Sequence, residues 1–264
     1  MTIDRVDGVI ARPGEEPTPL LLLPGHVCDY AVWALVLPHL AGHADCRIPE
    51  FSDEPSLPAM ADHVLAGAPA TFALAGHSMG GRVALEVVRQ APERVERLAL
   101  LDTGCRALSA EANGEEERTR RLAFRAAARE QGMRALGDAI LERMVLPARL
   151  ADAALVDAIL AMVARQTPER VARQSDALLA RQDASAVIGA FAGPVVVICG
   201  ADDSVSPVAQ NQELAELAPS GTFVVIPDCG HMAPMERPAE VAAALADWLR
   251  LPVARGATAF AGAS

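Results

Sequence analysis

Residues 73–85 read ALAGHSMGGRVAL, an apolar run that passes through glycines around a single serine into a helical pattern. To turn from strand to helix within one residue, Ser78 must adopt a strained backbone conformation. Side chains two positions before and two positions after it would collide, and Gly76 and Gly80 carry none. The stretch therefore predicts a strand, a sharp turn and a helix, with the Ser78 hydroxyl at the carboxyl end of the strand.

Short apolar runs bounded by turn residues recur along the chain. They lie at residues 19–25, 71–78, 95–104, 194–203 and 222–230, with a weaker run at 46–51. Segments with apolar residues at helical spacing alternate with them, at residues 56–67, 79–91, 207–217 and 238–250. Runs that are apolar on both faces are typical of parallel strands covered on both sides. The alternation predicts an α/β fold with a mostly parallel, doubly wound sheet.

The middle of the chain, residues 104–190, contains no strand-like run and is rich in Ala, Arg and Glu. Three or four helices are predicted there, separated near Gly132, Pro147 and Pro168. The alternation of strands and helices resumes at the end of this block. We therefore predict an all-helical cap, or lid, inserted into the α/β domain.

A length of 264 residues suits one large α/β domain with an insert. The predicted core consists of residues 1–103 and 191–250, and the cap of residues 104–190. Residues 251–264 are rich in small side chains and are expected to form a flexible C-terminal tail.

Composition narrows the classes of partner and compartment. The net charge is −11, which disfavours binding to nucleic acid or to an anionic membrane surface. The five cysteines are odd in number and widely spaced, so they fit no disulfide framework and no metal clip. The first ten residues lack the pattern of a signal peptide, and no apolar stretch is long enough to span a membrane. A cytoplasmic protein without metal or cofactor is expected.

A serine hydroxyl becomes a nucleophile when a base removes its proton, so a histidine is expected beside Ser78. His231 follows the last predicted strand and should lie at the same edge of the sheet. His77 adjoins the serine, but neighbouring side chains at a tight turn point apart, so it is predicted to be a packing residue. Three further histidines are expected at the surface: His39, His43 and His63.

A carboxylate is expected to orient the imidazole of His231. Asp203 lies just beyond the predicted strand at 194–203 and is favoured. Asp102, at the end of the preceding strand, is the competing candidate and is otherwise a turn or hinge residue. Asp202 should point away from the site into solvent.

Four motifs in this order resemble the α/β-hydrolase superfamily. They are PGH at 24–26, GHSMGG at 76–81, GADDSVSP at 200–207 and CGHMAPMERP at 229–238. The resemblance covers residues 18–250 and has the superfamily's order of Ser78, Asp203 and His231 along the chain. It implies that these three residues form a catalytic triad.

The resemblance also implies an oxyanion hole built from two backbone N–H groups. One belongs to Met79, the residue after the serine. The second comes from the loop after an early strand, where Pro24 replaces the usual histidine of such loops. The aligned donor is the N–H of His26, and a shift of one residue makes it that of Val27.

These residues predict a serine hydrolase that cleaves a small to medium carboxylic ester through an acyl-enzyme. A carbon–carbon bond hydrolase or enol-lactone hydrolase of aromatic-compound degradation is the alternative, because such relatives use the same triad. A catalytically silent, ligand-binding member of the fold is the least favoured class, because such members usually lose a triad residue. The expected partner is a small-molecule ester or related carbonyl compound, and the helical cap or outer helices offer surfaces for a homodimer.

Overall fold

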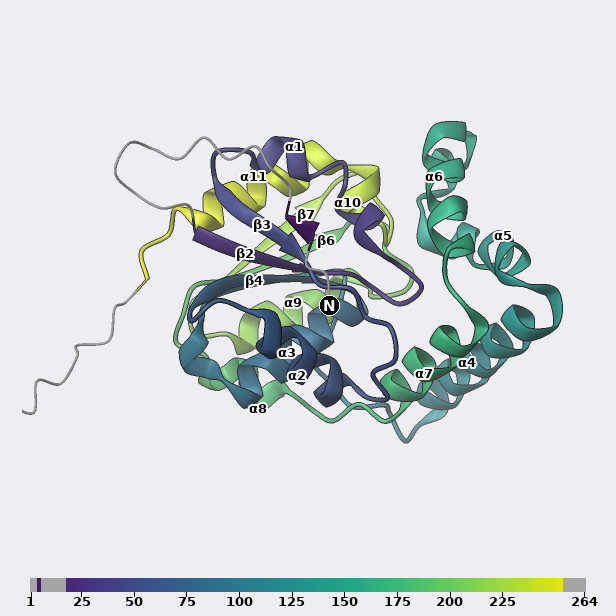
Figure 1. Ribbon diagram of the computed structural model, residues 1–264, viewed down its shortest axis with the longest axis horizontal. Coiled ribbons are helices and arrows are strands. Elements are labelled where there is room, and N and C mark those ends of the chain that lie inside the picture. Colours follow the sequence, from purple (N-terminus) through teal and green to yellow (C-terminus); the bar gives the residue numbers. More distant parts are fainter. Residues whose placement is uncertain (1–3, 6–17, 254–264) are drawn as a thin grey trace, which may run out of the picture.

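The computed structural model describes residues 4–5 and 18–253, and a seven-stranded sheet runs through this part of the chain (Figure 1). From one edge to the other the strands are β1 (Asp4–Arg5), β3 (Ala44–Ile48), β2 (Thr18–Leu23), β4 (Phe72–His77), β5 (Val95–Leu101), β6 (Val195–Gly200) and β7 (Gly221–Ile226). Only β1 pairs in the antiparallel direction. The predicted mostly parallel sheet is confirmed.

The order of the strands places the loops that matter for function side by side. The chain moves from β2 outward to β3, then crosses back to β4 and continues to β7 on the other side. β2 and β4 are therefore neighbours at the point where the winding reverses, and Leu23 pairs with Gly76. Ligands of open α/β sheets bind at the carboxyl ends of strands at such a reversal.

Helices cover both faces of the sheet (Figure 1). On one face lie α1 (Leu37–Leu40) and α11 (Pro238–Leu249), which follows the short α10 (Ala233–Glu236). On the other lie α2 (Leu57–Gly67), α3 (Met79–Gln90), α8 (Ser185–Ala190) and α9 (Val208–Leu217). Three 3₁₀ helices complete the described connections: η1 (Tyr30–Val32), η2 (Pro92–Arg94) and η3 (Pro147–Ala151).

Strand β2 shows why the sheet must be covered on both sides. Leu20 and Leu22 belong to the apolar cluster on one face, and Leu21 and Leu23 to the cluster on the other. All four side chains are fully buried. Burial of each leucine side chain stabilises the fold by about 2 kcal/mol, so a strand with this pattern is stable only between two layers of helices.

The predicted helical block, residues 104–190, contains helices and no strand, and we call it the helical insert. Its five α-helices are α4 (Ala112–Gln131), α5 (Met133–Met144), α6 (Ala153–Ala164), α7 (Pro168–Leu179) and α8. The prediction of three or four was too low, because the six residues of α8 are too few to show a helical period. Helices α4 to α7 stand off the carboxyl end of the sheet (Figure 1).

The predicted separations inside the insert each have a local cause. Gly132 ends α4 with a φ of 86°, a backbone conformation that glycine adopts without strain. Pro168 stands at the first position of α7, where its missing N–H costs nothing, and Thr167 caps that helix.

Among residues 18–253, no helix is both long and apolar enough to cross a lipid bilayer. Of the predicted tail, only residues 251–253 lie within the described part.

Candidate active site

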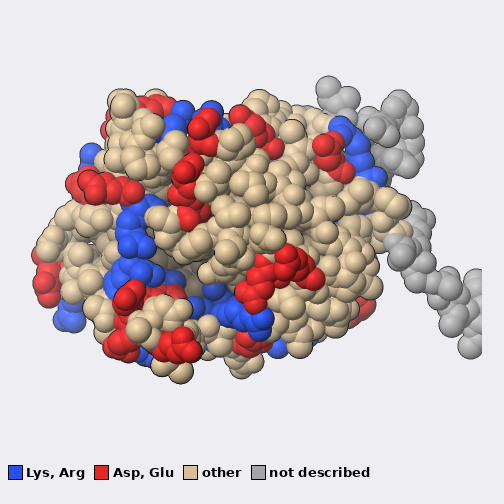
Figure 2. All heavy atoms as spheres, turned by 180° about the vertical axis from the view of Figure 1, so that it is seen from behind, with Lys and Arg blue, Asp and Glu red and all other residues tan. Residues whose placement is uncertain are grey.

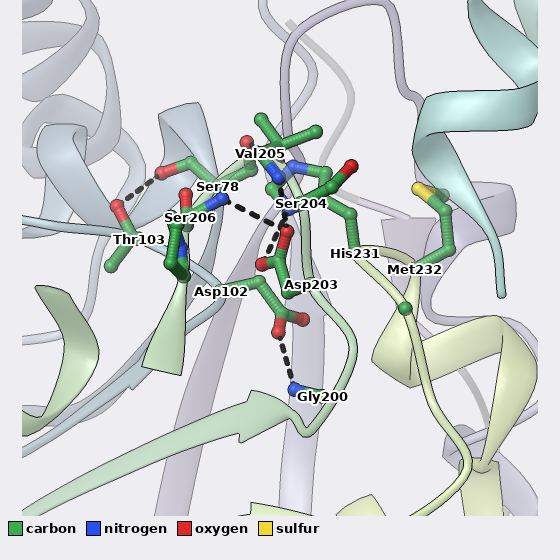
Figure 3. A network of polar contacts seen from close by, with 12 residues as sticks. Ser78, Asp102, Thr103, Gly200, Asp203, Ser204, Val205, Ser206, His231 and Met232 are labelled. Carbon is green, nitrogen blue, oxygen red and sulfur yellow. Dashed lines mark hydrogen bonds and ion pairs between the residues drawn. The ribbon is translucent and has the colours of Figure 1, made fainter. Parts of the chain in front are cut away.

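Ser78 stands at the turn between β4 and α3, with φ 54° and ψ −116°. Its N–H donates to the carbonyl oxygen of Leu101 at 2.8 Å, and its own carbonyl accepts from Oγ1 of Thr103 at 2.8 Å. Both partners belong to the end of β5 and the residues that follow it. The end of β5 and the residues after it thus hold both the N–H and the carbonyl group of the strained residue. The hydroxyl takes no part in these bonds and points away from the sheet (Figure 3).

The glycines around Ser78 are required by close backbone approach. A Cβ on Gly76 would lie 2.3 Å from the carbonyl oxygen of Gly80. A Cβ on Gly80 would lie 2.3 Å from the carbonyl oxygen of Leu23. Real Cβ atoms do not approach backbone atoms this closely. The predicted collision across the turn therefore accounts for Gly76, whereas Gly80 is required by the backbone at the end of β2.

A chain of hydrogen bonds connects the serine to a histidine and a carboxylate. Nε2 of His231 lies 2.9 Å from Oγ of Ser78, and Nδ1 of the same ring lies 2.9 Å from Oδ2 of Asp203. The other carboxylate oxygen of Asp203 accepts from the N–H groups of Val205 and Ser206 at 2.7 and 2.9 Å (Figure 3). Asp203 is buried and fully hydrogen-bonded, and it faces the ring nitrogen that needs a proton acceptor.

The two competing aspartates lie elsewhere. Asp102 is buried behind Asp203, where it accepts from the N–H of Gly200 at 3.0 Å and does not contact His231 (Figure 3). Burial, together with the nearby charge of Asp203, raises the pKa of Asp102 well above its usual range. Asp202 is exposed. Of the three, only Asp203 is placed to orient the imidazole.

His77 is buried as a packing residue would be, but it also makes a specific contact. Its Nε2 lies 2.8 Å from the carbonyl oxygen of His231, and the two rings are 5.2 Å apart. A carbonyl only accepts, so Nε2 carries the proton and donates it. Burial, with a further effect of His231, lowers the pKa of His77 to about 3, which keeps the ring neutral. His77 thus holds the backbone of the residue that faces Ser78.

The two candidates for the second oxyanion donor differ in their hydrogen bonds. The N–H of Val27 donates to Oε1 of Gln174 at 3.1 Å and is therefore occupied. Within the described part of the chain, the N–H groups of His26 and Met79 have no hydrogen-bond acceptor. Both residues line the pocket beside Ser78. The geometry favours His26 over Val27.

A pocket with about 880 Å³ of empty space, part of it open to solvent, lies over Ser78 and His231. The helical insert contributes four apolar residues to its lining, from α4, α5 and α7: Phe124, Ile140, Met144 and Leu178. The insert therefore forms one wall of the pocket and the loops after the strands form the other. Met144 is one of the methionines that the sequence places in the insert, and it contacts both this pocket and the core cluster.

Two buried polar residues that support the site were missed at the sequence level. Glu236 accepts from the N–H groups of Gly230 and Met232, on either side of His231, at 3.0 and 3.2 Å. Asn211 accepts from the N–H of Thr103 at 3.1 Å and donates to the carbonyl oxygen of Ser206 at 2.7 Å. Their partners lie between four residues away, for Met232, and 108 residues away, for Thr103, and no motif in the sequence signals either role.

The remaining histidines and the cysteines offer no second centre. His39 and His43 are exposed as predicted, whereas His63 is half-buried and pairs with Glu54 at 2.9 Å. The five cysteines are buried and free, and burial followed by the charge of Asp29 raises the pKa of Cys28 to about 12. In the described part of the chain, no group of three His, Cys, Asp or Glu side chains is arranged to hold a metal ion.

Comparison with known proteins gives matches over most of the chain. A model of the alpha/beta hydrolase family matches residues 16–244. The pimeloyl-(acyl-carrier protein) methyl ester esterase of Aromatoleum aromaticum is 28% identical over 250 aligned residues, covering 88% of this chain and 98% of the relative. The structure of a thermophilic esterase from Thermogutta terrifontis has a TM-score of 0.79 at 27% identity, covering 95% and 98% of the two chains. The enol-lactonase of Burkholderia xenovorans LB400 has a TM-score of 0.78 at 23% identity, covering 90% and 94%.

Proposed function

Because this chain belongs to the alpha/beta hydrolase family and is a hydrolase of that type, we propose that it cleaves small to medium carboxylic esters through Ser78. In this proposal His231 is the general base and Asp203 orients it. The single observation that carries the proposal is the unbroken series of 2.9 Å contacts from Ser78 through His231 to Asp203, at the wall of a pocket.

The first half of the reaction forms an acyl-enzyme. Oγ of Ser78 attacks the ester carbonyl carbon while Nε2 of His231 takes the hydroxyl proton. The negative charge that develops on the carbonyl oxygen is stabilised by the N–H groups of Met79 and His26, each of which lacks another acceptor among the described residues. His231 then gives its proton to the departing alkoxide, and the alcohol leaves.

The second half regenerates the enzyme. His231 removes a proton from water as the water oxygen attacks the acyl carbon, and the bond to Ser78 breaks with return of that proton to Oγ. The acid is released and Ser78 is restored. Asp203 keeps its place beside Nδ1 of His231 throughout, because Val205 and Ser206 donate hydrogen bonds to its other carboxylate oxygen.

The relatives favour an ester over the other bonds that the same residues can cleave. The relative from Aromatoleum aromaticum is named as a methyl ester esterase, and the structure from Thermogutta terrifontis is that of an esterase. The enol-lactonase, at 23% identity, supports only the shared fold. The proposed partner is accordingly a small-molecule ester. A cytoplasmic location and a homodimer stay predictions.

Hydrolysis of p-nitrophenyl acetate and butyrate, with the Ser78→Ala variant, tests the proposal. Replacing Ser78 should lower kcat by about 10⁴-fold or more, because the nucleophile is lost while the fold is kept. A fluorophosphonate probe should label the wild-type protein and not the variant. Ser220→Ala is the matched control, because Ser220 is exposed at the opposite end of the sheet.

Other outcomes would contradict the proposal in distinct ways. Full turnover by Ser78→Ala would exclude Ser78 as the nucleophile. Slow ester turnover beside rapid cleavage of a diketone would assign the chain to the carbon–carbon bond hydrolases. A wild-type protein that neither turns over esters nor reacts with the fluorophosphonate would be a ligand-binding member of the fold.

A further inference from the structure

The pocket over Ser78 carries a charge opposite to that of the molecule. Its lining includes five arginines and one carboxylate, an excess of four positive charges, in a chain whose net charge is −11. The arginines come from α3, α4, α5 and the residues after α7: Arg82, Arg120, Arg121, Arg143 and Arg181. Figure 2 shows basic side chains, all of them arginine in this sequence, gathered around a hollow on the surface.

The one carboxylate of this pocket, that of Glu117, is already bound. It accepts from Arg121 at 2.8 Å and from Arg181 at 2.7 and 2.9 Å. Burial alone would raise the pKa of Glu117, but the hydrogen bonds and charges of Arg181 and Arg121 lower it to about 2. Glu117 is therefore ionised at neutral pH and neutralises part of the charge of these two arginines.

The other three arginines have no carboxylate partner among residues 18–253. Arg82 donates only to the carbonyl oxygen of Arg106, and the guanidinium groups of Arg120 and Arg143 form no hydrogen bond there. Burial, with the charge of Arg181, lowers the pKa of Arg82 to about 9. Burial, with the charge of Arg143, also lowers the pKa of Arg120. Glu117 acts on Arg82, and Glu117 and Glu116 act on Arg120, but neither guanidinium has a direct carboxylate partner. Partly buried cations without a direct ion pair are costly, which points to an anionic ligand for them.

Two other arginines of α4 do not line this pocket and have acidic partners. Arg118 approaches Glu115 at 3.7 Å, and Arg125 forms an ion pair with Asp176. The arginines that line the pocket therefore place an excess of positive charge beside Ser78, where a substrate would bind.

We propose that this pocket binds esters that carry a second, anionic group, a carboxylate or a phosphate, and that Arg82 and Arg120 bind that group. The inference rests on the proposed function, since it names the substrate class for hydrolysis at Ser78. A guanidinium presents paired N–H donors that match the oxygens of a carboxylate or phosphate, and a partly desolvated site strengthens such hydrogen bonds. Arg143, which is exposed at the rim, adds attraction for the approaching anion.

Matched methyl esters test the substrate class. Monomethyl glutarate and dimethyl glutarate present the same scissile bond and differ in one charge at the far end. Methyl 4-phosphonobutyrate replaces the carboxylate by a phosphonate, so it distinguishes the two sources of charge. The wild-type kcat/KM should be at least tenfold higher for one of the charged esters than for dimethyl glutarate, and added salt should reduce this preference.

Variants of the pocket arginines test which residues cause the preference for charged esters. Arg82→Gln and Arg120→Gln should each lower the ratio of charged to neutral kcat/KM about ten- to hundredfold, mainly through KM, because a charge-assisted hydrogen bond is lost. Arg118→Gln, outside the pocket lining, should keep the wild-type ratio. If Arg82→Gln fails to fold, Arg120→Gln carries the test, because the Arg120 side chain makes no hydrogen bond to the described residues. A preference for dimethyl glutarate, or an unchanged ratio in Arg120→Gln, overturns the proposal.

A binding measurement separates this inference from the proposed function. Calorimetric titration of Ser78→Ala with glutarate and with inorganic phosphate requires no turnover. Binding that weakens at least tenfold on adding Arg120→Gln, but not on adding Arg118→Gln, supports the anion site even if no ester is cleaved. Binding of neither probe, beside efficient cleavage of neutral esters, would leave the proposed function standing and overturn the anion site.

Discussion

Backbone strain is concentrated in the loops that build the site. Among residues 18–253, four non-glycine residues have a positive φ, and each lies directly after or a few positions after a strand, at its carboxyl end: Val27, Ser78, Asp102 and Asp228. Each such conformation costs about 1–3 kcal/mol. Neighbouring groups hold these residues in place: Ser78 through Leu101 and Thr103, Val27 through Gln174, and Asp102 through Gly200.

The glycine before the serine provides a stability prediction at this scale. Gly76→Ala should lower the free energy of unfolding by about 3 kcal/mol, because its Cβ would lie 2.3 Å from a backbone oxygen that cannot move without displacing α3. Urea denaturation measures the change. Gly189→Ala is the control, since its Cβ would meet nothing closer than 3.7 Å and alanine favours the helix. Equal stability of the two variants would mean that the turn accommodates a Cβ at position 76.

At the scale of elements, Glu236 joins the loop that carries His231 to the helical insert. Besides Gly230 and Met232, it accepts from the N–H of Leu146, at 2.9 Å, just beyond α5. One buried carboxylate thus fixes three backbone groups from two parts of the chain. Burial raises the pKa of Glu236, while the three N–H groups oppose that effect.

Replacing this carboxylate should affect both stability and rate. In Glu236→Gln the NH₂ group of the new side chain would face backbone N–H groups that need an acceptor. The variant should lower the free energy of unfolding by about 2–3 kcal/mol. The kcat for p-nitrophenyl butyrate should fall about tenfold, because the loop that positions His231 is loosened. Urea denaturation and initial rates measure the two effects. Glu240→Gln, an exposed position on α11, should change neither. A stable and fully active Glu236→Gln variant would show that Glu236 does not position the loop that carries His231.

Two histidines, the buried His77 and the partly buried His26, make the stability of the whole molecule sensitive to acid. Burial, followed by the charge of Arg121, lowers the pKa of His26 to about 3, as burial does for His77. Between pH 6.5 and pH 3 these rings bind protons in the unfolded chain but not in the folded one, so stability falls as the pH falls. The loss from each is up to about 2 kcal/mol at pH 5, and above pH 6.5 it vanishes.

Urea denaturation at pH 7.5 and pH 5.0 measures this loss. His77→Gln keeps a donor for the carbonyl oxygen of His231 but cannot be protonated, so it should lose about 2 kcal/mol less than wild type between the two pH values. His39→Gln, at an exposed position, should follow the wild type. A His77→Gln variant with the same acid sensitivity as wild type would show that His77 is protonated in the folded protein.

Much of the fold could be predicted from the sequence because its signals are local. The apolar runs and the GHSMGG turn are set by neighbouring residues, and the alternation around them leads to the parallel sheet. The charge of the pocket could not be predicted, because Arg82 and Arg120 lie on helices far apart in the sequence and only the fold places both on one pocket. Glu236 and Asn211 were missed for the same reason: their partners are backbone groups of other elements.

The helical insert is fastened to both loops that face Ser78. Gln174, on α7, accepts from the N–H of Val27, next to His26, which lines the pocket. Leu146, after α5, donates to Glu236 and so to the support of His231. If the insert swung outward to admit a bulky molecule, both attachments would part and the attacking group would lose its surroundings at the same moment. We therefore expect ester cleavage only while the insert stays attached to both loops.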